Sequence, residues 1–291
     1  MGMGVVRSLA RHGVRTFTRD VRPEADREAA VLGALPCESA AALAREAHVA
    51  IVLVVDDSQV DDVLFGMHGA ASAFAPGSVV VVSSTLDPLY VADLAPRLAA
   101  YGIDLVDAPV SGGPAKASAG TMTMIVAGPS GARARCAPVF SHIAGRVFDV
   151  GERPGQAATF KIVNNLLAAV NLAAGAEALV LAKKAGIDPR AALDVINASS
   201  GASWIVADRM NRILSGDKDV RAATKILAKD VGIAAALGAR VQADVPFANA
   251  AQRAFREAVG AGLGDEDDAS MLQLFATRAG VTIGGAGERL S

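Results

Sequence analysis

The chain has 291 residues, and 52% of them are hydrophobic, so it can bury a core large enough for two domains of ordinary size. Its charge is nearly balanced, with 28 Lys and Arg against 30 Asp and Glu. No basic run is long enough to neutralise a series of phosphates, which argues against nucleic acid as a partner.

The first twenty residues match the later part of a dinucleotide-binding element, without its beginning. Residues 1–2 read as the end of a glycine turn, residues 4–12 as a helix and residues 14–18 as a strand. Asp20 falls 18 residues after Gly2, close to where an acidic side chain accepts the ribose hydroxyls of NAD. Gly2 alone fits an ordinary helix start equally well. The first strand and two glycines are missing, and we interpret this as a mis-assigned start or a truncated chain.

The first half of the chain alternates short β-branched runs with helical stretches, the pattern of βαβ units. Helices are expected between the strands, notably at residues 58–64 and 88–100. The pattern predicts an α/β fold: a Rossmann-type doubly wound sheet, lacking its first strand, over residues 1–153. The expected strands are residues 14–18, 50–55, 78–82, 104–106, 122–127 and 146–150.

Residues 154–291 are predicted to form an all-α domain for substrate binding and dimerisation. From Gly155 onward the β-branched runs stop, and Asp188-Pro189 reads as an N-cap followed by proline in the first helical position. The first helix, residues 156–185, would be about 45 Å long and apolar around most of its circumference. This favours a homodimer or homotetramer, although a simple interdomain helix explains the pattern equally well.

The remaining composition points to a reducing, cytoplasmic setting. Cys37 and Cys136 have no partners at disulfide or metal-ligand spacing, so we expect two core thiols and no metal. No signal peptide is visible, and the apolar runs in the first half are far shorter than the roughly 20 residues of a membrane span. We therefore expect no membrane partner.

Two motifs resemble those of the β-hydroxyacid dehydrogenases, the family of 3-hydroxyisobutyrate dehydrogenase. Residues 107–121 read DAPVSGGPAKASAGT and resemble its substrate-binding motif, and residues 161–165, KIVNN, resemble its catalytic motif. The segments LVVDDSQVDDVLFG (53–66), SST (83–85) and GASW (201–204) are most similar to the L-threonate dehydrogenase branch. The resemblance covers nearly the whole chain and implies hydride transfer between a nicotinamide cofactor and a small hydroxy acid.

Lys161 is the expected general acid/base. None of the four histidines lies in a recognisable catalytic setting. Lys161 begins an apolar helix, where desolvation would lower the pKa of its ammonium and let the amine accept a proton. Asn165, one turn further along the same face, would bind the same hydroxyl or carboxylate. By spacing alone, Lys161 would more often be a snorkelling surface lysine.

The Ser111-Gly112-Gly113 turn is expected to bind the substrate carboxylate. It follows a predicted strand end, where open α/β sheets place their ligands, and two glycines leave backbone N–H groups accessible. Without the resemblance, a plain turn would be the better interpretation. Ser111 is not expected to be a nucleophile, since no histidine can be placed beside it.

The resemblance also assigns cofactor contacts. Thr85 would reach the nicotinamide ribose, the backbone of Val54 and Val55 would lie along the cofactor, and Lys229 matches the family's cofactor-contacting lysine. Read without the resemblance, Thr85 is an ordinary strand end and Lys229-Asp230 an exposed charge pair.

Asp20 favours NAD because a carboxylate repels a 2′-phosphate. The flanking Arg19 and Arg22 could serve such a phosphate instead, so NADP stays open.

Two other functions fit parts of the sequence. Imine reduction uses the same architecture, but usually with another residue where Lys161 stands. A non-catalytic binding or interaction module is suggested by the incomplete glycine turn and opposed by the retained lysine. The favoured substrate is an aldonate such as L-threonate, followed by 3-hydroxyisobutyrate-like and glycerate-like compounds.

Overall fold

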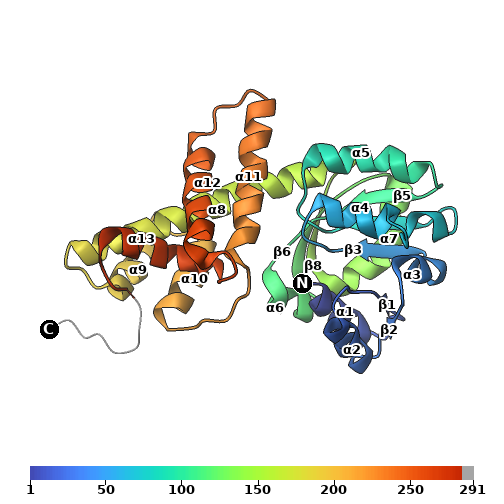
Figure 1. The fold of residues 1–291 in the computed structure, drawn as a ribbon, viewed down its shortest axis with the longest axis horizontal. Coiled ribbons are helices and arrows are strands. Elements are labelled where there is room, and N and C mark those ends of the chain that lie inside the picture. The colour runs from blue at the N-terminus through green and yellow to red at the C-terminus, as the bar shows by residue number, and fades with distance from the viewer. Residues whose placement is uncertain (284–291) are drawn as a thin grey trace. The chain divides into compact units, whose positions relative to one another are not determined.

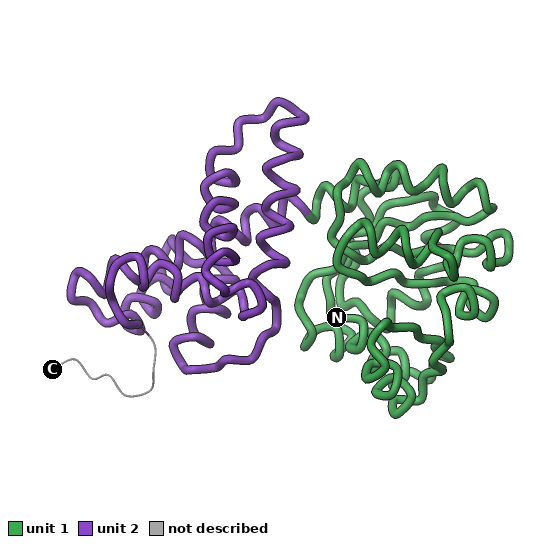
Figure 2. Tube along the Cα trace, in the orientation of Figure 1, with its two compact units in different colours: residues 1–161 green, residues 162–291 purple. Residues whose placement is uncertain are grey.

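The chain divides into two compact units, residues 1–161 and 162–291, and the computed structural model describes residues 1–283 (Figure 2). The division lies inside helix α8 (Gln156–Lys184), which both units share. The domain boundary predicted at residues 153 and 154 lies just before this helix begins.

The first unit is built on a mixed six-stranded sheet in the order β3-β4-β5-β7-β6, with β8 beside β7. Strands β3, β4 and β5 are parallel, whereas β7 runs antiparallel to β5 and β6. The antiparallel part was not predicted, because β6 is only two residues long. The strands are β3 (Val49–Val52), β4 (Val79–Val82), β5 (Asp104–Asp107), β6 (Val110–Ser111), β7 (Met122–Ala127) and β8 (Ala144–Gly151).

Both faces of this sheet are covered, as the doubly wound prediction requires (Figure 1). In β4, Val80 and Val82 belong to one apolar cluster and Val79 and Val81 to another, because successive side chains point to opposite faces. Helices α3 to α5 contribute to the first cluster, and α1, α6 and α7 to the second. The helices are α1 (Gly2–Arg11), α2 (Pro23–Val31), α3 (Ala40–Glu46), α4 (Asp57–Phe65), α5 (Pro88–Ala99), α6 (Gly113–Ala119) and α7 (Ser130–Ile143), with a 3-10 turn at Ala71–Ala73.

A second, two-stranded sheet stands apart from the first. Strands β1 (Phe17–Thr18) and β2 (Leu35–Pro36) pair in parallel with each other, and β3 ends the larger sheet with β4 as its one described neighbour. The strand predicted at residues 14–18 is therefore shorter than expected. No described strand pairs with both β1 and β3.

The second unit is helical over its described residues, 162–283, apart from one isolated bridge between Ala223 and Asp267. Its core packs α8 against the later helices through buried residues such as Leu172, Met210 and Phe255. Asp188 caps α9 as predicted, accepting the N–H groups of Arg190 and Ala191. The further helices are α9 (Pro189–Asn197), α10 (Trp204–Leu214), α11 (Thr224–Arg240), α12 (Pro246–Ala258) and α13 (Met271–Ala279), with short turns at Val259–Leu263 and Asp268–Ser270.

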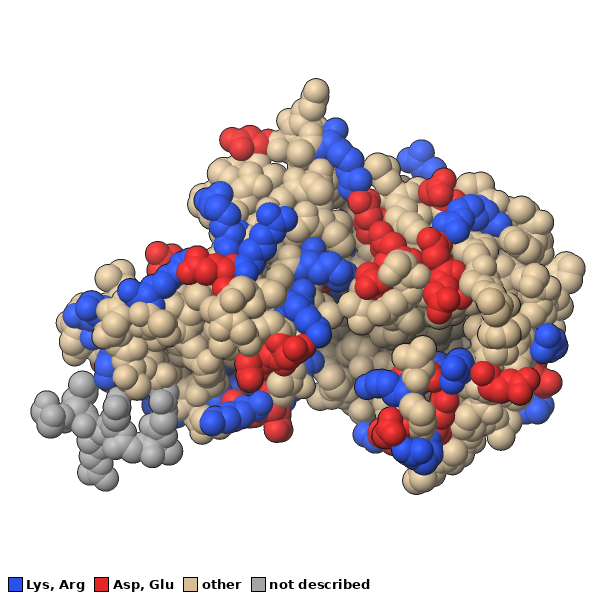
Figure 3. Space-filling view, in the orientation of Figure 1, with Lys and Arg blue, Asp and Glu red and all other residues tan. Residues whose placement is uncertain are grey.

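The surface agrees with the balanced composition. Basic and acidic side chains are interspersed on the visible face of each unit (Figure 3). Among the described residues, α8 is long and apolar enough by length and composition to cross a membrane, which the short apolar runs of the first half did not suggest. Core helices of globular proteins pass the same test.

Candidate active site

Four of the predicted cofactor residues line one cavity of about 1340 Å³ in the first unit. They are Gly2, Asp20, Val54 and Val55, contributed by α1 and by the segments that follow β1 and β3. A Cβ built on Gly2 would meet no atom within 4 Å, so the backbone there is open to a ligand. The volume includes the apolar space between β1 and β3, lined by residues such as Phe17 and Ile51, so it is not a measure of the ligand. The open glycine backbone and the acidic side chain suit a dinucleotide.

The segment after β3 is held by side chains that the sequence did not single out. Ser84 Oγ accepts the N–H of Val54 at 2.8 Å, and Gln59 Oε1 accepts the N–H of Val55 at 2.9 Å. Ser84 is buried and directly precedes Thr85, so it ties the ends of β3 and β4 together. Thr85 itself is not among the residues that line the cavity. Both amides already have protein partners, so a cofactor beside them would contact other backbone atoms.

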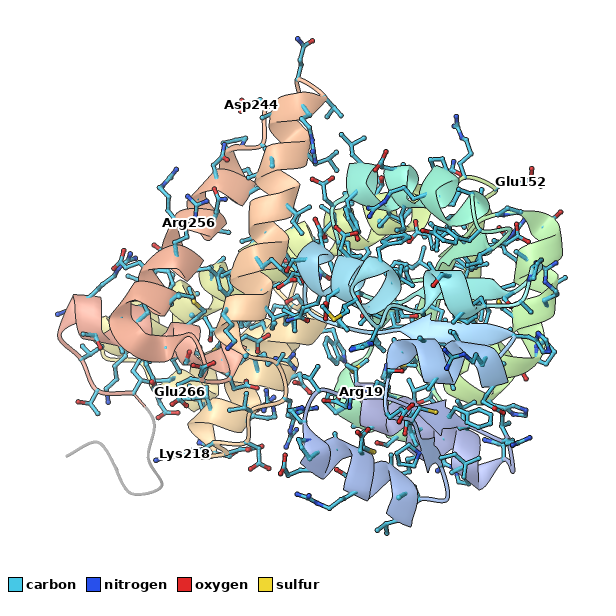
Figure 4. All side chains as sticks on the ribbon, turned by 45° about the vertical axis from the view of Figure 1, so that its right-hand side comes forward. Arg19, Glu152, Lys218, Asp244, Arg256 and Glu266 are labelled. Atoms are coloured by element: carbon cyan, nitrogen blue, oxygen red, sulfur yellow. The ribbon has the colours of Figure 1, made fainter. Side chains whose placement is uncertain are left out.

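Asp20 is paired with Arg22 rather than standing alone. Its carboxylate accepts Arg22 Nε at 3.1 Å, Nη2 at 3.2 Å and the backbone N–H at 2.9 Å. The hydrogen bond from Arg22 is the main reason that the pKa of Asp20 lies below its ordinary value. Arg19, labelled in Figure 4, contacts the Asp20 carbonyl at 2.7 Å and Asp26 at 3.3 Å. This corner therefore offers one carboxylate and two guanidinium groups.

The Ser111-Gly112-Gly113 turn follows a strand end, but the strand is the unpredicted β6 and not the expected strand at residues 104–106. Ser111 ends β6 and Gly113 begins α6, and the two glycines have φ values of +129° and +73°. A Cβ on Gly112 would come within 2.7 Å of Lys116 Cδ, whereas one on Gly113 would meet nothing within 4 Å. Glycine is therefore required by conformation at both positions, and the backbone of Gly113 faces open space.

Lys161 is buried, with 6% of its surface exposed, in the second turn of α8. The alternative of a snorkelling surface lysine is therefore wrong. Fully buried lysines are rare in folded proteins, and one placed for chemistry is a common reason for the exception.

In the second unit, Asn165 is joined to the Lys-Asp pair of α11. Asn165 Nδ2 donates to Asp230 Oδ2 at 2.6 Å, and Lys229 Nζ lies 2.9 Å from the other oxygen, Asp230 Oδ1. The contact with Lys229 is an ion pair, and this buried oxygen has no hydrogen bond among the described residues. Asp230 is 3% exposed, so the reading of an exposed charge pair is wrong for it. The sequence motif pointed to this pair but not to its contact with Asn165.

A doubly wound sheet with an open glycine backbone and an acidic side chain beside one cavity, followed by a helix that carries a buried lysine, is typical of two-domain nicotinamide-dependent dehydrogenases. Two family models match the chain: the NAD-binding domain of 6-phosphogluconate dehydrogenase over residues 1–151, and the NAD-binding domain of NADP-dependent 3-hydroxyisobutyrate dehydrogenase over residues 155–275.

Individual proteins agree with these models over nearly the full length. An L-threonate dehydrogenase from Cupriavidus necator is 41% identical over 94% of this chain and 93% of its own. The crystal structure of a 3-hydroxyisobutyrate dehydrogenase from Salmonella typhimurium has a TM-score of 0.87 and 37% identity, covering 94% and 95% of the two chains. A solved complex of the protein Psf3 with NADP+ has a TM-score of 0.86 and 26% identity, covering 94% and 96%.

The chain belongs to the β-hydroxyacid dehydrogenase family, in its L-threonate branch. It is an NAD(P)-dependent oxidoreductase that acts on a small hydroxy acid, as predicted from the motifs. No observation favours the non-catalytic alternative.

Proposed function

We propose that the protein oxidises an aldonate, with L-threonate the first choice and 3-hydroxyisobutyrate-like acids next, and that Lys161 is its general acid/base. The observation that carries the proposal is the burial of Lys161 in an apolar helix that follows the family's substrate motif. The named activity of the L-threonate dehydrogenase relatives supports the choice of substrate.

In the proposed mechanism a nicotinamide cofactor, held by Gly2, Asp20 and the segment after β3, would supply the acceptor for the hydride of the alcohol carbon. The neutral amine of Lys161 accepts the hydroxyl proton as that hydride leaves, and in the reverse direction its ammonium returns the proton to the carbonyl oxygen. Because the amine is withdrawn from water, it exchanges its proton with the substrate rather than with bulk solvent. Asn165, fixed by Asp230, would orient the hydroxyl, and the backbone of the Ser111-Gly112-Gly113 turn would bind the carboxylate.

We also propose that the protein is a homo-oligomer that uses α8, which leaves apolar side chains uncovered. Phe160, Val163 and Leu167 lie along α8 at helical spacing and are 54%, 59% and 58% exposed. A second copy covering this row would remove it from water. Sedimentation at micromolar concentration is expected to give a dimer or tetramer, and a monomer at every concentration would contradict this. A cytoplasmic location remains a prediction.

The substrate is tested by a panel of C3 and C4 hydroxy acids, each assayed with NAD+ and with NADP+ for formation of the reduced cofactor. L-Threonate is expected to give the highest kcat/KM, and its D-enantiomer serves as the matched control. A higher kcat/KM for 3-hydroxyisobutyrate would move the assignment to that substrate. Absence of turnover for every acid, with cofactor bound, would contradict the proposal.

A further inference from the structure

Asp107 is a buried carboxylate that the proposed mechanism does not use. It ends β5, is 1% exposed, and stands four residues before Ser111. The backbone around it is fixed, since the N–H of the next residue, Ala108, donates to the carbonyl of Val82 in β4 at 2.8 Å. The side chain therefore projects from the rigid centre of the sheet.

This carboxylate accepts hydrogen bonds from the beginning of α8. Asp107 Oδ2 accepts the N–H of Gly155 at 2.8 Å and that of Ala158 at 2.9 Å. The donors are 48 and 51 residues away in sequence, so Asp107 caps the helix from a distant strand. Its negative charge also suits the positive end of the helix dipole.

Gly155 completes the contact because its conformation and its packing both exclude a side chain. Its φ is +95°, and a Cβ there would lie 2.7 Å from the carbonyl oxygen of Pro88 and 3.3 Å from Ala92 Cβ in α5. The start of α8 is therefore held between the sheet and α5. Lys161, three residues after Ala158 on the same rigid helix, takes its position from this anchor.

We propose that Asp107 is a positioning residue, which fixes the first turn of α8 relative to the substrate-binding turn and so sets where the Lys161 amine stands. The inference rests on the proposed role of Lys161. Asp107 touches neither substrate nor cofactor in this account, and it acts through the helix. Burial raises the pKa of Asp107 to about 6, opposed by the N–H groups of Ala158, Gly155 and Ala157, as expected for a carboxylate enclosed by protein.

The test compares Asp107→Ala with Asp107→Asn, whose amide oxygen can still accept both N–H groups. Asp107→Ala is expected to lower kcat by roughly 10²-fold, because a displacement of about 1 Å at the reacting group costs that much. The dissociation constant of the cofactor should change less than about threefold, and Asp107→Asn should recover most of kcat. A structural role alone would lower the melting temperature and leave the kcat of the folded fraction unchanged.

Asp188→Ala is the matched control, because Asp188 also accepts two backbone N–H groups at the start of a helix, here α9, and no proposed site residue lies on that helix. It is expected to keep kcat. Unchanged kcat in Asp107→Ala, or an Asp107→Asn variant as slow as Asp107→Ala, would overturn the inference. Lys161→Met, measured in parallel, separates the two proposals. If Lys161→Met is inactive and Asp107→Ala has normal kcat, only the positioning role of Asp107 fails. If Lys161→Met is active, the proposed role of Lys161 fails.

Discussion

At the scale of single residues, the cofactor corner shows how neighbouring charges modify one side chain. In the proposed cofactor site the Asp20 carboxylate would repel a 2′-phosphate, but Arg22 binds that carboxylate with a forked contact and Arg19 adds a second guanidinium. An Arg22 that turned away from Asp20 could bind a phosphate in a bidentate manner. The same corner therefore suits NAD with Asp20 as acceptor and NADP with Arg22 as donor.

We predict that Asp20→Ala raises the ratio of kcat/KM for NADP+ over NAD+ by roughly tenfold, about 1.4 kcal/mol, because the repulsion of the 2′-phosphate is removed. Arg22→Ala should lower the same ratio. Initial rates with both cofactors measure it. A ratio that neither substitution changes would show that this corner does not choose the cofactor.

Site residues inside a motif could be predicted from the sequence, and those defined by distant contacts could not. Lys161 and the two glycines of the Ser111-Gly112-Gly113 turn were identified by resemblance to family motifs; Lys161 is buried and both glycines have positive φ, while their roles stay predictions. The contacts of Ser84 with Val54 and of Asn165 with Asp230 join residues 30 and 65 positions apart. No periodicity marks such pairs, because the fold alone brings them together.

At the scale of elements, residues 122–127 were predicted with the bounds of β7, and the long helix α8 within one residue. Alternation and capping fix such elements locally. The two-residue strands β2 and β6 were missed, since two residues carry no period.

The space between β1 and β3 leads to a prediction about cofactor affinity. An extension before Met1 of about five β-branched residues and a glycine turn would form a parallel strand there and extend the phosphate-binding backbone. The cavity already has apolar side chains from α1, β1 and β3 on its walls, including Val5, Phe17 and Ile51. The dissociation constant of NAD+ should fall by roughly tenfold or more.

The control for this extension is a version with proline at alternate positions, which cannot donate the ladder hydrogen bonds. Calorimetry on the three proteins gives the dissociation constants. Equal values for the unextended chain and the β-branched extension would count against a strand site between β1 and β3.

At the scale of the whole molecule, the ionisation of Asp107 links stability to pH. Its pKa is about 6 in the folded chain, above the ordinary value of 3.8, so the folded state binds the proton more tightly than the unfolded state does. The protonated carboxyl therefore adds to the free energy of unfolding below about pH 4, and this contribution is lost as pH rises through about 6.

Asp107→Asn should therefore change stability in a pH-dependent way. The free energy of unfolding of the variant minus that of the parent should be larger at pH 8 than at pH 4 by roughly 2–3 kcal/mol. The reason is that the variant has no charge to bury at high pH. Urea unfolding at the two pH values measures the difference. A difference between the two proteins that is the same at both pH values would contradict the assigned ionisation.

The central claim, that the buried amine of Lys161 exchanges the substrate proton, is tested most directly by single-turnover hydride transfer in Lys161→Met. The exposed Lys184→Met at the other end of α8 is the control. We predict that Lys161→Met slows reduction of the cofactor by about 10³-fold or more, while its cofactor dissociation constant and the rate of the control stay near those of the parent. Reduction within tenfold of the parent rate would show that another group transfers the proton.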